Sequence, residues 1–387
     1  MQYVRQYVQS AELICSSYDG SLPLAAFLKQ YFSRYKKFGS RDRKAISHLC
    51  YSFYRLGKAA MQLSFEERVK LALFLCEDAA GNWASLFDED WLQNWLTNVD
   101  DRLEFVKKHY ADLQLEDTFQ WTDHLSDGID ADAFCSSHFK QPGLFLRLRP
   151  GYEQQVQHKL ADADIRFETR SANCLELPNA SKVDSILQLN KEAVVQDMSS
   201  QRVANFFPGE DVKTLWDCCA ASGGKAILAH DHLKEVQITA TDIRPAIIAN
   251  LKTRLREAGI NDVVTQVHDI SFSSPWKKSR TFDLILCDVP CSGSGTWGRT
   301  PEQLYYFDGK KIGEYAALQQ RIVNTAVGAM HSGSWLLYIT CSVFREENEQ
   351  QVEYLMKQHG LQLIRSSLIK GYDQRADTMF AALLVKN

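Results

Sequence analysis

The sequence has no long apolar segment, no internal repeat and no low-complexity run. No stretch approaches the roughly 18 to 20 apolar residues that a membrane-spanning helix requires. The first residues, MQYVRQYVQSAELI, alternate charged and apolar groups too often for a signal peptide. We therefore expect a globular cytoplasmic protein without a membrane segment, and 387 residues suffice for two or three domains.

Cysteine pairs at metal-binding spacing are also missing. The chain has ten cysteines, and none of them forms a Cys-x-x-Cys pair. The nearest approach is Cys287 with Cys291, and its first member ends an apolar, strand-like run. Without a signal peptide, reduced thiols are favoured over a disulfide framework. No metal site is expected.

Positive charge is not in excess, because the formal net charge is -4. An overall acidic balance does not indicate a nucleic-acid partner, but it can hide a local basic face. Residues 34–44, RYKKFGSRDRK, contain six Lys or Arg against one Asp. This segment fits a solvated loop before a helix capped by Ser40, and it equally fits a contact with RNA phosphates. Both interpretations stay open.

Periodicity divides the chain into three parts. Apolar residues at helical spacing, such as Ala45, Leu49 and Phe53, predict an all-helical domain over residues 1–130. From Gly143 short apolar pieces alternate, with a strand over 144–148 and a helix over 153–161, which predicts a small α/β subdomain over 140–210. The third part, residues 211–387, is a regular series of strands and helices.

In this third part, strands are predicted at residues 214–218, 238–241, 263–267, 282–287 and 335–340. One intervening helix ends at Gly259, and another runs from Ile312 through Met330 and ends at Gly333. Alternating strands and helices predict a mainly parallel sheet that is covered on both faces. The whole chain is thus a multidomain α/β protein. Ligands belong at the carboxyl ends of its parallel strands.

Those strand ends carry a pattern that fits a nucleoside. The first strand ends in DCCAASGGK (217–225), the second ends at Asp242, and Asp269 follows the third. Small residues let the backbone approach a ligand, and a carboxylate can accept both hydroxyls of a ribose. Gly-x-Gly-x-x-Gly is absent, and Cys219 and Ala226 break the P-loop pattern. Alone, Asp242 could be a helix cap and Asp269 a turn residue, but three successive acids favour a nucleoside without a phosphate chain, with S-adenosylmethionine the obvious candidate.

Two cysteines follow the next two strands. Cys291 lies in DVPCSGSG (288–295) and Cys341 in ITCS (339–342), and both are flanked by Ser or Gly. Because neighbouring strand ends gather in one crevice, we expect these cysteines to lie near each other and near the cofactor. The role of a small buried hydrophobic residue is expected instead for Cys15, Cys50, Cys76 and Cys287.

The three segments DCCAASGGK, DVPCSGSG and ITCSVFREENE resemble the motifs of the RsmB/NOP2/Sun family of RNA cytosine-5 methyltransferases. The resemblance continues through VVQDMSSQ, RTPE, ALQQRIV and MFAALLVKN, and so covers residues 140–387. The first third, with SRDRKAISHLCYSFYRLG, is similar to the NusB-like domain of the bacterial RsmB branch. The resemblance implies a Rossmann-like S-adenosylmethionine-dependent methyltransferase sheet after a small α/β module and an all-α NusB-like domain.

The resemblance also implies roles for single residues. Cytosine C5 is a poor nucleophile, so a thiolate must first add to C6, and Cys341 matches the family nucleophile. Asp288 matches the acid near N3, and Cys291 matches the residue that assists product release. The implied cofactor-binding residues are Cys219, Ala220, Ala221, Ser222, Gly223, Gly224, Lys225, Asp242 beside ribose, Asp269 beside adenine, and Asp288.

Several positions depart from the family pattern. Ser222 replaces the loop proline and should loosen the turn, and Thr378 replaces a usual glycine. Gly298 replaces one of two usual arginines and leaves Arg299, and Arg149 stands where Asn is common. No reacting group is lost, so these departures bear on RNA placement.

The expected partner is RNA, with ribosomal RNA first and transfer RNA second. We expect a monomer that binds RNA through Arg147 and Arg299. Further candidates for phosphate contact are Arg149, Lys277, Lys278 and Arg280. Two rival readings stay open. One is a methyltransferase that uses Cys291 as its nucleophile, as DNA cytosine methyltransferases use their Pro-Cys cysteine. The other is a catalytically silent RNA-binding factor of ribosome assembly.

Overall fold

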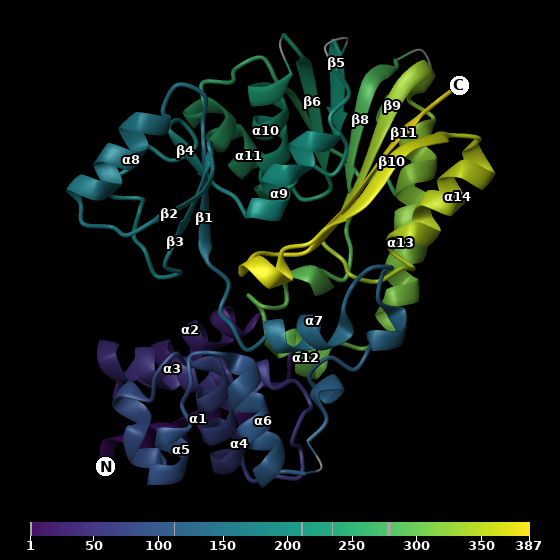
Figure 1. Ribbon diagram of the computed structural model, residues 1–387. Coiled ribbons are helices and arrows are strands. Elements are labelled where there is room, and N and C mark those ends of the chain that lie inside the picture. The colour runs from purple at the N-terminus through teal and green to yellow at the C-terminus, as the bar shows by residue number, and fades with distance from the viewer. Residues whose placement is uncertain (1, 112, 210–211, 234, 277–279) are drawn as a thin grey trace. The chain divides into compact units, whose positions relative to one another are not determined.

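The computed structural model describes residues 2–111, 113–209, 212–233, 235–276 and 280–387 (Figure 1). The chain forms two compact units. A helical unit contains Met1–Leu125, Ile129–Gln141 and Thr296–Gly309, and a sheet unit contains Ser126–Gly128, Pro142–Gly295 and Lys310–Asn387. The predicted domain boundary at 210 and 211 falls on residues outside the described ranges.

The helical unit is built from apolar helix faces, as its periodicity predicts. Its helices are α1 (Gln2–Ser17), α2 (Leu24–Arg34), α3 (Ser40–Arg55), α4 (Phe65–Cys76), α5 (Glu89–Gln93), α6 (Val99–His109), α7 (Ala131–Ser137) and α12 (Glu302–Tyr306). Leu49 and Phe53 of α3 lie in its buried core. The predicted cap at Ser40 is wrong by one residue. Gly39 is the N-cap, and its N–H donates to the Asp42 carboxylate over 2.9 Å.

The segment 296–309 joins the helical unit, although the sequence pattern placed it with the third part of the chain. The Glu302 carboxylate accepts a hydrogen bond from the Leu24 N–H over 3.0 Å. The Tyr306 hydroxyl donates to the Tyr18 carbonyl over 2.7 Å. Such contacts between residues far apart in sequence leave no local signal, which is why periodicity could not assign this segment.

The first sheet of the sheet unit is small and antiparallel, with strand order β2-β3-β1-β4. Its elements are β1 (Leu144–Leu148), β2 (Glu168–Ser171), β3 (Cys174–Leu177) and β4 (Ala193–Val195), with α8 (Glu153–Asp162) and α9 (Met198–Arg202). The predicted strand at 144–148 and the helix after it are confirmed.

The second sheet has seven strands in the order β10-β11-β9-β8-β5-β6-β7. Its strands are β5 (Thr214–Asp217), β6 (Gln237–Asp242), β7 (Val264–Val267), β8 (Phe282–Asp288), β9 (Met330–Thr340), β10 (Gln362–Ile369) and β11 (Met379–Val385). The five strands from β5 to β9 pair in parallel, which confirms the mainly parallel sheet. Strands β10 and β11 are antiparallel and were not predicted.

Helices cover both faces of this sheet (Figure 1). Apolar residues of α10 (Gly224–His232) and α11 (Pro245–Glu257) pack on one face. Those of α13 (Lys310–Val327) and α14 (Glu349–His359) pack on the other. No helix in the described part of the chain is long and apolar enough to cross a membrane.

One predicted helix boundary is wrong. Helix α13 ends at Val327, and Met330 begins β9, where it pairs with Phe282 of β8. The register shifts between this pair and the next, and Gly333 with φ +83° lies in the irregular stretch. Gly333 therefore lies at a bulge inside a strand. The sequence could not distinguish this bulge from a helix end, because both favour a glycine in the left-handed conformation.

Candidate active site

The loop after β5 takes its shape from small residues. Gly223 has φ +86° and is the N-cap of α10, and a Cβ there would lie 2.3 Å from the Leu251 side chain. The Ala221 N–H donates to the Asp242 carboxylate over 3.1 Å, which ties the loop to the end of β6. The backbone thus forms a tight bend at the carboxyl ends of β5 and β6, where the sequence predicts a ligand.

Ser222 replaces a usual proline in this bend, and the sequence suggested that the bend would therefore be loose. In the structure, hydrogen bonds hold Ser222 in place. The Arg254 guanidinium donates to the Ser222 carbonyl over 3.0 Å and to its hydroxyl over 2.7 Å. The same side chain donates to the Asn190 amide oxygen over 3.0 Å. Two charge-assisted hydrogen bonds hold the turn from outside, in place of the rigid ring.

A cavity of about 500 Å³ opens at these strand ends. Its lining includes, among other residues, Cys219, Ala221, Asp242, Ile243, Asp269, Ile270, Asp288, Pro290, Cys291, Leu318 and Cys341. Predicted cofactor and catalytic residues therefore share one cavity. Asp242 accepts two hydrogen bonds of 2.9 Å from the Arg244 guanidinium, which holds the pKa of that carboxyl below its usual range against the opposing effect of burial. Asp269 accepts hydrogen bonds from the N–H and hydroxyl of Ser271, so it is a turn residue that also faces the cavity.

Asp217, at the end of β5, is buried next to two cysteines that line the cavity. Neither of its carboxylate oxygens has a well-formed hydrogen bond to any described residue. Burial raises its pKa to about 7, the charge of Asp288 adds to the rise, and Lys225 opposes it. Native buried carboxylates are nearly always paired. An unpaired acid and three more carboxylates around the cavity suit a ligand with positive centres, such as the sulfonium and ammonium of S-adenosylmethionine.

Lys225 is the buried cation of the site. Its ammonium donates to the Asp288 carboxylate over 2.5 Å. Burial alone would lower the pKa of Lys225, but Asp288 raises it, and Cys341 and Asp217 raise it further. The ammonium therefore lies within electrostatic reach of Cys341. A cation at this place favours negative charge on a nearby sulfur.

The two cysteines meet, as the strand order predicts. Cys291 Sγ lies 3.3 Å from Cys341 Sγ, and both are free thiols that line the cavity. The hydrogen bond with Cys341 and burial raise the pKa of Cys291 well above its usual value, with Glu347 adding to the rise.

Behind the thiols lies a network that the sequence did not single out. Glu347 is fully buried and accepts hydrogen bonds from the Ser292 N–H, the Ser342 hydroxyl and the Gln319 amide. Gln319 also donates to the Pro290 carbonyl over 3.1 Å. Glu347 lies in ITCSVFREENE and Gln319 in ALQQRIV, so position within a motif was the signal that could have found them.

Gly295 fixes the end of the Cys291 loop. Its N–H donates to the Cys341 carbonyl, and its carbonyl accepts from the Thr378 N–H, both over 2.9 Å. A Cβ on Gly295 would lie 1.9 Å from the Thr378 carbonyl oxygen. Thr378, which replaces a usual glycine, accepts hydrogen bonds at its hydroxyl from the N–H groups of Gly371 and Tyr372. The residues before β11 therefore close on the loop that carries Cys291.

Arg147 and Arg149 have structural partners in place of the RNA expected for them. Arg147 is 1% exposed, and its guanidinium donates to Asp231 over 2.5 Å and to Gln196 over 2.8 Å. Arg149 binds the same carboxylate and the Ala258 carbonyl. Asp231 belongs to α10, so the two arginines join the small antiparallel sheet to the larger sheet. Phosphate cannot reach Arg147 in this arrangement, which corrects the prediction for that residue.

The other candidate cations are spread over the chain. Arg299 lies in the segment Thr296–Gly309, which belongs to the helical unit. Arg280 lies 4.2 Å from the centre of the Trp276 ring and donates to Thr239. Lys277 and Lys278 lie outside the described residues. Among the described residues, no three side chains of His, Cys, Asp or Glu are grouped to hold a metal.

The basic cluster of residues 34–44 lies at the turn between α2 and α3. Its exposed cations are Arg34, Lys36, Lys37, Arg41 and Lys44. The Tyr31 and Tyr35 rings lie 4.6 Å apart at the end of α2, and Tyr35 is half exposed. Exposed cations beside an aromatic ring fit both a solvated turn and a contact with single-stranded RNA.

Part of the chain is similar to known proteins. Residues 204–381 match the family model of the 16S rRNA methyltransferase RsmB/F. Ribosomal RNA small subunit methyltransferase B of Citrobacter koseri is 29% identical over 57% of this chain and 53% of its own length. The protein of the same description from Xanthomonas campestris is 30% identical over 59% of this chain and 54% of its own length. The chain spans about half the length of the curated relatives it matches.

Solved structures share the fold. The crystal structure of PH0851 has a TM-score of 0.71 at 19% identity and covers 99% of this chain and 98% of its own. NSun6 from Pyrococcus horikoshii, crystallised with SFG, has a TM-score of 0.60 at 14% identity and covers 69% of this chain and 97% of its own. At these identities the likeness shows the fold alone.

Proposed function

The chain belongs to the RsmB/NOP2/Sun family through residues 204–381, and from this premise we infer that it methylates C5 of a cytosine in RNA. The observation that carries the inference is the pair of thiols, Cys291 and Cys341, 3.3 Å apart in a cavity that acidic strand ends also line. Cytosine C5 chemistry requires a methyl donor and a nucleophilic sulfur, and a second thiol next to the first can assist release of the product.

Several residues would hold the cofactor. S-adenosylmethionine, when bound, supplies an electrophilic methyl group on a sulfonium. Asp242 would accept the ribose hydroxyls, Asp269 would lie beside adenine, and the bend from Cys219 to Lys225 would let the backbone approach. The unpaired Asp217 would balance a positive centre of the ligand.

The reacting groups then divide the work. The Cys341 sulfur adds to C6, which makes C5 nucleophilic enough to take the methyl group. Negative charge that develops on the ring is neutralised when a proton passes to N3 from the Asp288–Lys225 pair, with Asp288 as the group that faces the base. After methyl transfer a base takes the C5 proton, the C5=C6 double bond forms again, and the Cys341–C6 bond breaks to return Cys341 as a thiolate. Cys291 is the residue proposed to assist this release.

Ribosomal RNA of the small subunit is the first substrate proposed, because the relatives from Citrobacter and Xanthomonas are described by that activity. Transfer RNA is the second. The target cytosine must be single-stranded or flipped out of its helix, because a base that stays paired in a duplex cannot enter the cavity that the thiols line. The protein is proposed to act in the cytoplasm as a monomer.

The test is methylation of small-subunit ribosomal RNA with labelled S-adenosylmethionine, followed by nucleoside analysis and a denaturing gel. Wild type should form 5-methylcytidine. Cys341→Ala should form neither product nor adduct, and Cys291→Ala should accumulate a covalent RNA adduct. An adduct that requires Cys291 and survives Cys341→Ala would reverse the two roles. Cofactor binding without methylation of ribosomal or transfer RNA would favour the silent RNA-binding factor.

The helical unit is proposed to add a second RNA contact at residues 34–44. Lys36→Gln/Lys37→Gln should weaken binding of a labelled single-stranded RNA and lower the slope of log affinity against log salt by about 1.4. Lys107→Gln/Lys108→Gln, on exposed residues of α6, is the matched control. Equal effects of the two double variants would leave residues 34–44 as a solvated turn.

A further inference from the structure

Glu347 lies between the two loops that carry the thiols. Its carboxylate accepts 2.9 Å from the N–H of Ser292, which follows Cys291, and 2.8 Å from the hydroxyl of Ser342, which follows Cys341. One side chain therefore sets the position of both loops. Among the described residues proposed to be catalytic, Cys291, Cys341 and Asp288, none forms hydrogen bonds with both of these serines.

Helix α13 and strand β9 hold Glu347 in turn. The Gln319 amide donates to its carboxylate over 2.9 Å, and the Tyr338 hydroxyl donates to its backbone carbonyl over 2.7 Å. Gln319 accepts from the same Tyr338 hydroxyl at 3.1 Å. Because each polar atom in this chain of hydrogen bonds has a partner, the carboxylate has little freedom to move away from the thiols.

Charge is distributed unequally around the two sulfurs. The titratable groups that face Glu347 are Cys291, Tyr315 of α13 and Tyr338 of β9, and its negative charge opposes ionisation of each. Lys225, the buried cation of the site, interacts instead with Cys341. One thiol thus has an anion as neighbour and the other has a cation, although they lie 3.3 Å apart.

We propose that Glu347 is a positioning residue that aligns the two cysteine loops and places a carboxylate beside Cys291, which disfavours Cys291 as the nucleophile. The proposal rests on the two-cysteine reaction inferred above. The proposal explains why one of two adjacent thiols is the nucleophile, which the backbone positions of Cys291 and Cys341 do not determine.

Alkylation by iodoacetamide tests the proposal without RNA or cofactor. The rate at Cys291 is measured against pH by peptide mass spectrometry in a Cys341→Ala background, which removes the other cavity thiol. Adding Glu347→Gln removes the charge and keeps an oxygen acceptor. The pH midpoint for Cys291 should fall by up to about one unit, which means up to about tenfold faster labelling at neutral pH, while burial continues to raise the pKa of Cys291.

Three further variants separate charge from structure. Glu347→Asp keeps the charge and should restore the original midpoint, and Glu353→Gln, an exposed residue of α14, should change nothing. If Glu347→Gln does not fold, Ser342→Ala should shift Cys291 the same way by less, because a carboxylate that loses a donor is more readily protonated. An unchanged midpoint, or equally faster labelling of the core cysteines, would overturn the proposal. Absence of methylation with the shift intact would remove only the proposed function.

Discussion

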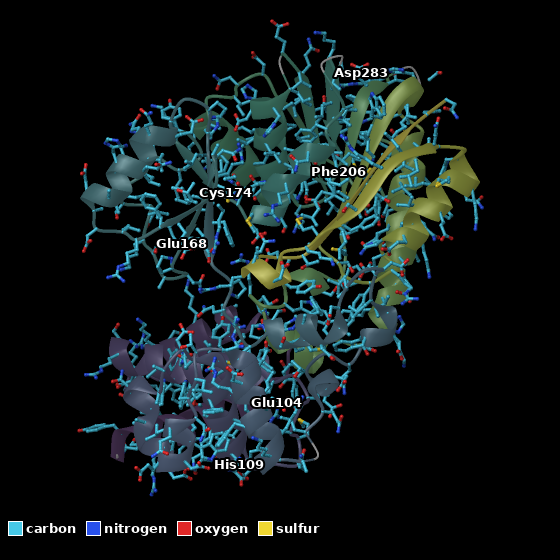
Figure 2. All side chains as sticks on the ribbon, viewed as in Figure 1. Glu104, His109, Glu168, Cys174, Phe206 and Asp283 are labelled. Carbon is cyan, nitrogen blue, oxygen red and sulfur yellow. The ribbon has the colours of Figure 1, made fainter. Side chains whose placement is uncertain are left out.

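The two ends of the parallel strands differ in how their acids are satisfied. At the amino end, Asp283 of β8 (Figure 2) accepts hydrogen bonds from the N–H groups of Lys213 and Thr214 and contacts His331. At the carboxyl end, Asp217 of β5 has neither oxygen well paired with a described residue, and it is buried. Both are aspartates on neighbouring strands of one sheet.

The pKa values follow this difference. Hydrogen bonds hold the pKa of Asp283 below its usual range, although burial opposes them, whereas burial raises that of Asp217 to about 7. Asp283 thus has its hydrogen-bond partners within the protein, whereas Asp217 is the acid for which we propose a partner in the bound cofactor. Both ends of the sheet carry an aspartate, so the presence of an acid does not distinguish them. The buried acid that lacks well-formed hydrogen bonds to described residues is the better marker of a functional site.

The largest difference in activity is expected between alanine substitutions of two glycines, one at each end of the sheet. In Gly295→Ala the new methyl group would meet the Thr378 carbonyl, so the Cys291 loop must move and methyl transfer should be abolished. Gly333→Ala, at the amino end, meets nothing within 4 Å and should cost only about 1 kcal/mol for its positive φ. Activity assays and urea unfolding measure both. Comparable activity in the two variants would contradict the assigned closure.

Stability against pH should have opposite signs at the two ends. Because the pKa of Asp217 is raised, the folded state binds more protons, and stability falls as pH rises from about 4 to 7. Asp217→Asn removes this loss and should gain stability relative to wild type by up to about 1.4 kcal/mol per pH unit over that range.

Asp283→Asn should act in the reverse sense, since its lowered pKa contributes stability above about pH 4 that is lost in acid. Urea titrations of the ligand-free protein from about pH 2.5 to 8 would show the two trends, that of Asp283 below about pH 4 and that of Asp217 between about pH 4 and 7. If the difference in unfolding free energy from wild type changed with pH in the same direction in both variants, the contrast between the two aspartates would be wrong.

Cofactor binding should depend on one end alone. Asp242→Ala removes the acceptor proposed for ribose, and the Kd for S-adenosylmethionine should rise about tenfold or more, the loss of a charged hydrogen bond. Asp283→Ala should leave the Kd as in wild type. Isothermal titration calorimetry measures both, and equal losses would point to unfolding in place of a lost contact.

The smallest effect is expected within the strands. Cys218 Sγ and Cys287 Sγ lie 3.4 Å apart, nearly the spacing of the cavity pair, but both are buried in the sheet. Cys287→Ala should cost about 1 kcal/mol of stability, the removal of one buried sulfur, and should leave adduct formation unchanged. Loss of the RNA adduct in this variant would mean that thiol spacing, and not access to the cavity, defines the reactive pair.

Sequence periodicity was sufficient to place the parallel strands, because several of them, such as β6 and β8, are short apolar runs that end at an aspartate. It placed Cys291 and Cys341 together because strand ends share an edge. It failed where partners are remote. Arg147 looked like an RNA contact because its acid, Asp231, lies 84 residues away. The role of Glu347 was equally hidden, since its donors come from three separate segments.

The contact between Gly295 and Thr378 also orders events during synthesis. Translation makes the chain from its amino end, so Cys291 and Cys341 are both in place before the residues at 378 that close over the first loop. Until then the loop that carries Cys291 lacks the contact with Thr378 that fixes its end. The site is therefore completed late in synthesis, when the residues before β11 have been made.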